Sequence, residues 1–181
     1  TAPLMDEDLK KWTAPFVMAG VNTKVVRRSN ALMGFLYGEE FSYQEALLTG
    51  SGWGGYARAM QVTIALGGIV LAGTIDMLGS ALQKYFLPKP GEGPGREERE
   101  KGFYNLIMLG TLEGEETLRV KVRGDRDPGY GSTSKIIGES GVCLALDDLP
   151  VEGGFWTPAS AMGDALLKRL PASAGLSFTL D

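Results

Sequence analysis

The chain has 181 residues, 44% of them hydrophobic and 22% charged, which is typical of a folded globular protein. Its formal net charge of −4 argues against nucleic acid as a partner. The absence of histidine excludes Ser-His-Asp and Cys-His catalysis and most zinc or iron sites within this chain, and no metal site is expected.

The first two predicted helices cover residues 4–12 and 23–34, and the second carries a cationic face. Asn22 or Thr23 suits its N-cap. Lys24, Arg27 and Arg28 follow at spacings of three and four, so they share one side of this helix. Such a face can act as a clamp for a phosphate or carboxylate, but a solvated or ion-paired helix surface is the commoner reason for it.

Residues 41–48 alternate as a strand does, and residues 56–86 then form the most apolar stretch of the chain. No charged residue lies between Arg58 and Asp76. We expect a buried or subunit-facing helix, with a homodimer through 56–86. A membrane-spanning helix and a helix lying on a membrane surface are the less favoured alternatives. The dimer would bury four apolar side chains: Ile64, Ile69, Val70 and Leu71.

The second half predicts a hairpin, a polar loop and a helix. A charged run at 96–101 indicates a solvated turn, and strands follow at 103–112 and 116–124. Pro128-Gly129 fits a type II turn, and Ser132 or Thr133 suits the cap of a helix over 132–146. This unit places three polar side chains beside a helix N-terminus, where anions are favoured: Asp125, Asp127 and Tyr130.

The last predicted elements are a helix over 158–170 and a short strand or tail over 176–180. Thr157-Pro158 is a strong helix start, and Pro171 is expected to end the helix. Cys143, the only cysteine, lies in an apolar helical pattern, which predicts a core residue rather than a nucleophile. The expected fold class is α+β, with one small mixed or antiparallel sheet packed against helices. Its members are the strands 41–48, 103–112, 116–124 and 176–180 and the helices 23–34, 56–86, 132–146 and 158–170.

The glycine-rich fingerprints of nucleotide-binding loops are missing from the sequence. The chain contains 26 glycines, yet neither G-x-G-x-x-G after a strand nor G-x-x-x-x-G-K-[ST] occurs. A dinucleotide pyrophosphate therefore has no binding loop of the usual kind in this chain.

Four segments, in this order and at this spacing, resemble the C-terminal portion of the saccharopine dehydrogenase-like oxidoreductases, the group that includes the trans-acting enoyl reductases. They read VNTKVVRRSNALMG, FLPKPGEGP, GDRDPGYGSTSKIIGES and GGFWTPASAMGDALLKRL. The resemblance runs from about Trp12 to Phe178. It implies that residues 1–181 are a single substrate-side and oligomerisation domain. It also implies an N-terminal Rossmann domain, absent from this chain, that binds NAD(P), so this chain alone binds no cofactor and transfers no hydride.

The resemblance further implies a hydrophobic or acyl substrate held between the two domains, in a cytoplasmic protein with membrane association as the alternative location. Arg27 or Arg28, with Asn22, would bind an acyl-carrier phosphate or carboxylate, and Tyr130 would donate a proton. Asp125, Asp127 and Thr157 would also face the substrate. Turn chemistry is the alternative role for the two aspartates, and helix capping for the threonine. The competing functions are a non-catalytic dimerisation module and a membrane-surface or lipid-surface protein that uses helix 56–86.

Overall fold

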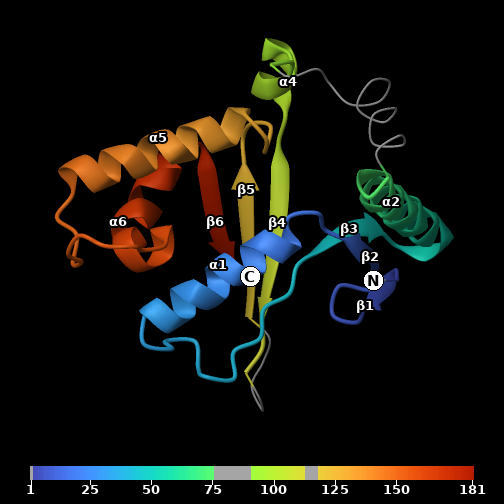
Figure 1. Cartoon of the computed structure of the whole chain (residues 1–181), viewed down its shortest axis with the longest axis horizontal. Helices are drawn as coiled ribbons and strands as arrows, with labels where there is room; N and C mark the ends of the chain where they lie inside the picture. Colours follow the sequence, from blue (N-terminus) through green and yellow to red (C-terminus); the bar gives the residue numbers. More distant parts are fainter. Residues whose placement is uncertain (1, 76–90, 113–117) are drawn as a thin grey trace. The chain divides into compact units, whose positions relative to one another are not determined.

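The computed structural model describes residues 2–75, 91–112 and 118–181. It contains helices and two small antiparallel sheets, and it divides into two compact units, Thr1–Glu92 and Gly93–Asp181 (Figure 1). The expected mixture of helices and antiparallel strands is confirmed, but the expected single sheet is wrong. The strand near 41–48 pairs with an N-terminal strand rather than with the strands of the second half. The assignment of residues 1–181 to one domain stays a prediction.

The first unit is built on a sheet of order β1-β2-β3. Its elements are β1 (Leu4–Asp6), β2 (Lys11–Pro15), α1 (Ala19–Leu32), β3 (Ala46–Gly50) and α2 (Gly52–Gly73). The predicted helix over 4–12 is wrong, because this stretch forms a hairpin. The Asp6 carboxylate accepts a hydrogen bond from the Leu9 amide at 2.7 Å, and Lys10 has a φ of 52°. The acidic cluster therefore makes a tight turn rather than the first turn of a helix.

The strand predicted at 41–48 is displaced toward the C-terminus and runs from Ala46 to Gly50. The aromatic side chains that suggested alternation lie outside it. The Phe41 ring lies 5.2 Å from the Tyr37 ring and 6.4 Å from the Tyr43 ring, centroid to centroid. The period-2 pattern here reflects an aromatic cluster in an irregular segment.

Helix α2 packs against the sheet through its first turns. The Tyr56 ring meets the Trp12 ring edge-on at 4.8 Å, and Ala59 is fully buried. The Thr49 hydroxyl donates to Trp12 O and Gly55 O, each at 2.9 Å. These contacts fix β2, β3 and the start of α2 as one packed layer.

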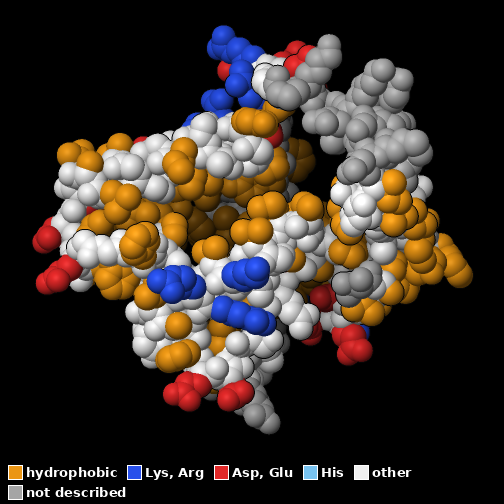
Figure 2. All heavy atoms as spheres, viewed as in Figure 1, with side chains coloured by type: hydrophobic (Ala, Val, Ile, Leu, Met, Phe, Trp, Pro, Cys, Tyr) orange, Lys and Arg blue, Asp and Glu red, His pale blue; other side chains and the backbone are white. Residues whose placement is uncertain are grey.

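Beyond its first turns, α2 is exposed within its own unit. Ile64 and Val70 are 66% and 69% exposed, and Figure 2 shows hydrophobic side chains on the surface over this helix. The described part of the first unit therefore leaves this portion of α2 uncovered, and the expectation of a buried or subunit-facing helix stays a prediction. By length and composition α2 is the one described helix able to cross a membrane, a test that core helices and signal sequences also pass. The homodimer stays a prediction, and residues 76–86 of the predicted helix lie outside the described residues.

The second unit has a sheet of order β4-β5-β6. Its elements are α4 (Arg96–Lys101), β4 (Tyr104–Gly110), β5 (Leu118–Gly124), α5 (Gly131–Leu146), α6 (Pro158–Ser173) and β6 (Leu176–Leu180). The three strands and the last two helices confirm the sequence-based predictions. The core gathers side chains from β5, α5, α6 and β6, and the predicted core residue Cys143 is fully buried in it.

Two predictions in this unit are wrong. The charged run 96–101 is a helix, α4, because its charges pair one turn apart: Arg96 with Glu100 at 2.9 Å and Lys101 with Glu97 at 2.5 Å. Pro171 does not end α6, which continues to Ser173. The interruption comes earlier, at Gly163, whose φ of 34° kinks the helix.

Candidate functional site

The loop between β5 and α5 is organised by one carboxylate. Asp127 accepts backbone hydrogen bonds from Gly129 at 2.9 Å, Tyr130 at 3.0 Å and Gly131 at 2.6 Å. Gly131 is the first residue of α5 and Gly129 and Tyr130 precede it, so the Asp127 carboxylate fixes the turn into the helix and caps the free amide of Gly131. The bonds, led by the one from Gly131, lower the pKa of the Asp127 carboxyl. Asp127 thus performs the turn chemistry that the sequence left open.

The two hydroxyls expected to cap α5 have other partners. The Ser132 hydroxyl is buried and lies 2.9 Å from the Tyr104 hydroxyl, while Thr133 donates to Pro128 O at 2.7 Å. The expected type II turn at Pro128-Gly129 is also wrong, since Gly129 is not among the described glycines with positive φ. The cap comes from Asp127 because its carboxylate reaches three successive amides.

Asp125 anchors the same loop to Gly175, the residue before β6. Its backbone amide donates to Gly175 O at 3.2 Å, and its carboxylate lies 3.7 Å from the Lys135 ammonium. A Cβ atom at Gly175 would come within 2.3 Å of Asp125 Oδ1, so the carboxylate lies directly against this glycine. Asp125 therefore holds the loop in place.

Tyr130 is the accessible group of this loop. Its side chain is 60% exposed, while its amide is held by Asp127. The ring lies beside Gly93, where a Cβ atom would be 3.5 Å from Tyr130 Cε2. Among the described residues, no hydrogen bond occupies its hydroxyl. The loop thus presents a phenol on a fixed backbone at the start of α5.

Thr157 caps α6, which is one of the two roles predicted for it; the other is contact with the substrate. Its hydroxyl accepts from the Ser160 amide at 3.4 Å, and its own amide donates to Ser160 Oγ at 3.0 Å. The residue also lines a hollow of about 560 Å³ with mainly apolar walls. Among the wall residues are Leu144, Leu149, Val151, Trp156 and Met162. Thr157 is therefore a capping residue at the edge of an apolar surface.

An ion-pair network joining α5 to α6 escaped the sequence analysis. Arg169 donates to both Asp147 oxygens at 2.6 Å, and its third contact is Glu139 at 3.4 Å. The guanidinium hydrogen bonds lower the pKa of Asp147 to about 2, and burial raises the pKa of the Cys143 thiol beside it. The partners are 22 and 30 residues from Arg169, so no local pattern indicates the network.

Arg169→Gln is expected to lower the free energy of unfolding at neutral pH. This free energy should then decrease less steeply as the pH falls than it does in the unaltered protein. Ionised Asp147 stabilises the fold above its ordinary pKa near 3.8, and that contribution is lost as pH falls toward the folded value of about 2. Without the guanidinium, the pKa of Asp147 in the folded protein approaches its ordinary value. Denaturant unfolding at several pH values measures this slope. Lys168→Gln, an exposed neighbour with the same charge change, is the control; equal slopes in both variants would contradict the prediction.

The first unit holds Asn22, Arg27 and Arg28. Asn22 Nδ2 donates to Glu45 Oε2 at 3.0 Å, and the Tyr43 hydroxyl donates to Glu45 Oε1 at 2.7 Å. Burial and the Glu45 carboxylate raise the pKa of Tyr43 to about 12. Asn22 thus ties α1 to the segment before β3.

Neither residue predicted to cap α1 does so, because the helix begins at Ala19, before both. Asn22 bonds to Glu45, and Thr23 donates to Ala19 O within the helix. The cationic face is present: Lys24, Arg27 and Arg28 are exposed, and Figure 2 shows basic side chains together over α1. The structure therefore brings Asp125, Asp127 and Tyr130 together in the second unit, while Asn22 and the cations belong to the first.

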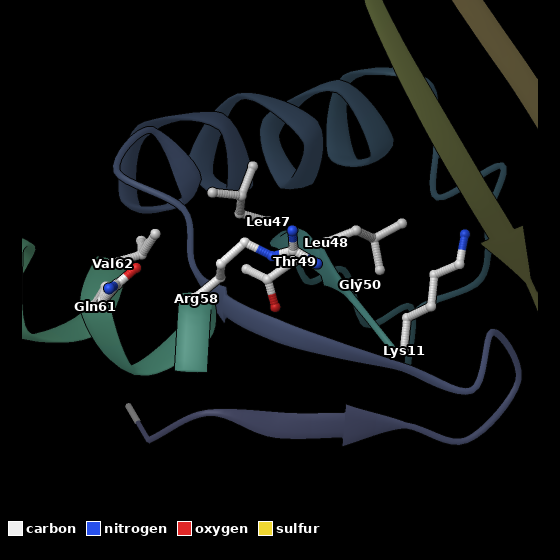
Figure 3. Close-up of a pocket in the computed structure, with 8 residues that line it drawn as sticks. All are labelled: Lys11, Leu47, Leu48, Thr49, Gly50, Arg58, Gln61 and Val62. Atoms are coloured by element: carbon white, nitrogen blue, oxygen red, sulfur yellow. The ribbon is translucent and has the colours of Figure 1, made fainter. Parts of the chain in front are cut away.

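A second hollow, also of about 560 Å³, lies in the first unit (Figure 3). Its lining comes from β3, α2 and the start of β2. The residues are Lys11, Leu47, Leu48, Thr49, Gly50, Arg58, Gln61 and Val62. Sequence analysis missed this site because its cations lie 47 positions apart in the chain, at 11 and 58. Within the described ranges, no three metal-ligating side chains lie together.

Comparison with known proteins finds similarity to trans-acting enoyl reductases. A trans-acting enoyl reductase of Mycobacterium bovis (strain BCG / Pasteur 1173P2) is 39% identical over 166 residues, and one of Mycobacterium ulcerans (strain Agy99) is 38% identical over 164. A Mycobacterium tuberculosis protein named in the same group is 42% identical over 175 residues, 92% of this chain and 41% of that relative. The chain is thus homologous to trans-acting enoyl reductases and spans about two-fifths of their length. No family model and no solved structure matches it.

Proposed function

We propose that this chain is the substrate-side part of an NAD(P)-dependent enoyl reductase of the saccharopine dehydrogenase-like type. The supporting observation is its similarity, over about 90% of its length, to proteins named trans-acting enoyl reductases. The missing glycine-rich fingerprint supports the proposal that the nucleotide site lies in another part of the full-length protein. An acyl group is the proposed substrate.

Reduction of an enoyl group adds a hydride to the β carbon and a proton to the α carbon of a C=C bond conjugated with a carbonyl. The nicotinamide supplies the hydride when it is bound. We assign the proton to the Tyr130 hydroxyl, whose O–H bond breaks as the C–H bond at the α carbon forms. The resulting phenolate regains a proton from water, which reaches a side chain that is 60% exposed.

Asp127 is the proposed positioning residue in the second unit. Asp127 keeps the Tyr130 backbone in one conformation through three hydrogen bonds, so the phenol is presented without further ordering of its loop. In the first unit, considered by itself, Arg27 and Arg28 share an exposed face of α1 that suits a phosphate or carboxylate.

The test uses the protein at its native full length, purified from its own cells, with an α,β-unsaturated acyl thioester. We expect oxidation of NADH or NADPH and formation of the saturated thioester. Deuterium carried by the nicotinamide should appear at the β carbon, and deuterium from heavy water at the α carbon. If neither cofactor supports reduction, or if the β carbon takes its deuterium from water, the proposal is wrong.

A further inference from the structure

The hollow in the first unit carries two cations that no described carboxylate neutralises. Lys11 and Arg58 line it, and neither forms an ion pair within residues 2–75, 91–112 and 118–181. Both cations line the same concave surface of the first unit. Such a pair attracts an anion.

A glycine sets the position of the Arg58 guanidinium. At Gly50, a Cβ atom would come within 2.7 Å of Arg58 Nη2, so the guanidinium lies close against the backbone of β3. Gly50 also has a φ of 109°, which strongly favours glycine. In Figure 3 the Arg58 side chain extends from α2 toward Thr49 and Gly50, and Lys11 lies beyond Leu48. The Arg58 guanidinium therefore lies beside the end of β3 and lines the hollow.

The rest of the lining is apolar or neutral. Leu47, Leu48 and Val62 provide hydrocarbon surface, and Thr49 and Gln61 provide neutral polar groups. A volume of about 560 Å³ lies within the range of small-molecule sites, on the order of 300–1,000 Å³. An inorganic ion would leave the apolar wall uncovered, whereas a ligand with a short alkyl chain would cover it.

We infer that this hollow binds an amphipathic anion, a phosphate or carboxylate head group carrying an alkyl chain, with Arg58 and Lys11 on the head group. The bidentate fork of arginine matches the geometry of either head group, and the leucines contact the chain. The inference goes beyond the proposed reductase function and does not depend on Tyr130. Its test therefore measures binding without turnover.

The experiment is a calorimetric titration of the full-length protein with octyl phosphate below its micelle concentration. Inorganic phosphate represents the head group of this probe and octanol represents its alkyl chain. Octanoate, titrated in the same way, compares a carboxylate head group with the phosphate. We expect octyl phosphate to bind at least tenfold more tightly than either inorganic phosphate or octanol alone. Arg58→Gln and Lys11→Gln should each weaken its binding roughly tenfold, the loss expected for one charge-assisted hydrogen bond.

Two further variants keep the result interpretable. Lys10→Asn removes the same charge one residue from Lys11, outside the lining, and tolerates the positive φ there, so affinity should stay within twofold. Arg58→Lys keeps the charge and should retain more affinity than Arg58→Gln. The inference is overturned if octyl phosphate binds no more tightly than inorganic phosphate. It is also overturned if Lys10→Asn weakens binding as much as Lys11→Gln, or if Arg58→Gln leaves binding unchanged.

Discussion

Tyr130→Phe is expected to lower kcat for enoyl reduction in the full-length protein by a factor of about 10² to 10⁴, the usual contribution of a positioned general acid. The variant removes only the hydroxyl oxygen and its proton, and keeps the ring that lies beside Gly93. The Asp127 hydrogen bonds go to backbone amides, so the loop should retain its conformation. Steady-state kinetics with a saturating thioester measure the effect.

The control for this prediction is Tyr37→Phe, which removes a phenol of similar exposure from the first unit. We expect its kcat to equal that of the unaltered protein within about twofold. Incorporation of deuterium from heavy water at the α carbon adds a second readout. This readout is specific because the proton donor acts only in the protonation of the α carbon. A kcat within threefold of the unaltered value for Tyr130→Phe would remove Tyr130 from the mechanism.

Gly55→Ala is expected to destabilise the first unit by about 3 kcal/mol or more, since a forced backbone shift costs more than an overpacked side chain. The added Cβ would lie 2.2 Å from Gly50 O and 3.2 Å from Trp12 Cδ1. The first neighbour is backbone of β3, which cannot rotate away. Helix α2 would have to move off the sheet to make room for the methyl group.

Gly54→Ala provides the matched control, because the same substitution one residue earlier meets nothing within 4 Å. It should stabilise α2 by up to about 1 kcal/mol, the usual gain from alanine over glycine in a helix. Urea unfolding followed by tryptophan fluorescence measures both variants, with Trp12 reporting on the packed layer. Equal midpoints for Gly54→Ala and Gly55→Ala would show that α2 does not approach β3 this closely.

The elements that sequence analysis predicted well are those whose patterns are set locally. β4, β5 and α5 carry periodic apolar residues, and the Thr157-Pro158 start of α6 is a local capping signal that the hydrogen bonds with Ser160 confirm. The wrong predictions concern segments whose secondary structure depends on pairing with residues far away in the chain. The stretch over 4–12 has an amphipathic helical pattern, yet β2 pairs with β3, more than thirty residues later, and becomes a strand.

The candidate sites divide in the same way. Turn residues and a following helix are enough to predict that Asp125, Asp127 and Tyr130 share one loop, because they lie within six consecutive residues. Their different roles follow from the hydrogen bonds of the folded loop. Asp127 accepts hydrogen bonds from three amides, whereas the Tyr130 side chain is exposed. The Arg169 network likewise requires α5 and α6 to pack together.

The sequence by itself determined the class of the protein: its balance of helices and strands, its polar loop before α5, the lack of a nucleotide-binding fingerprint and its resemblance to trans-acting enoyl reductases. These properties follow from residue type and short-range spacing. Only the tertiary structure decided that the strands form two sheets, that α2 leaves most of its apolar surface exposed, and that Lys11 and Arg58 line one hollow. Strand pairing and side-chain burial depend on contacts between residues far apart in the chain, and local spacing does not encode those contacts.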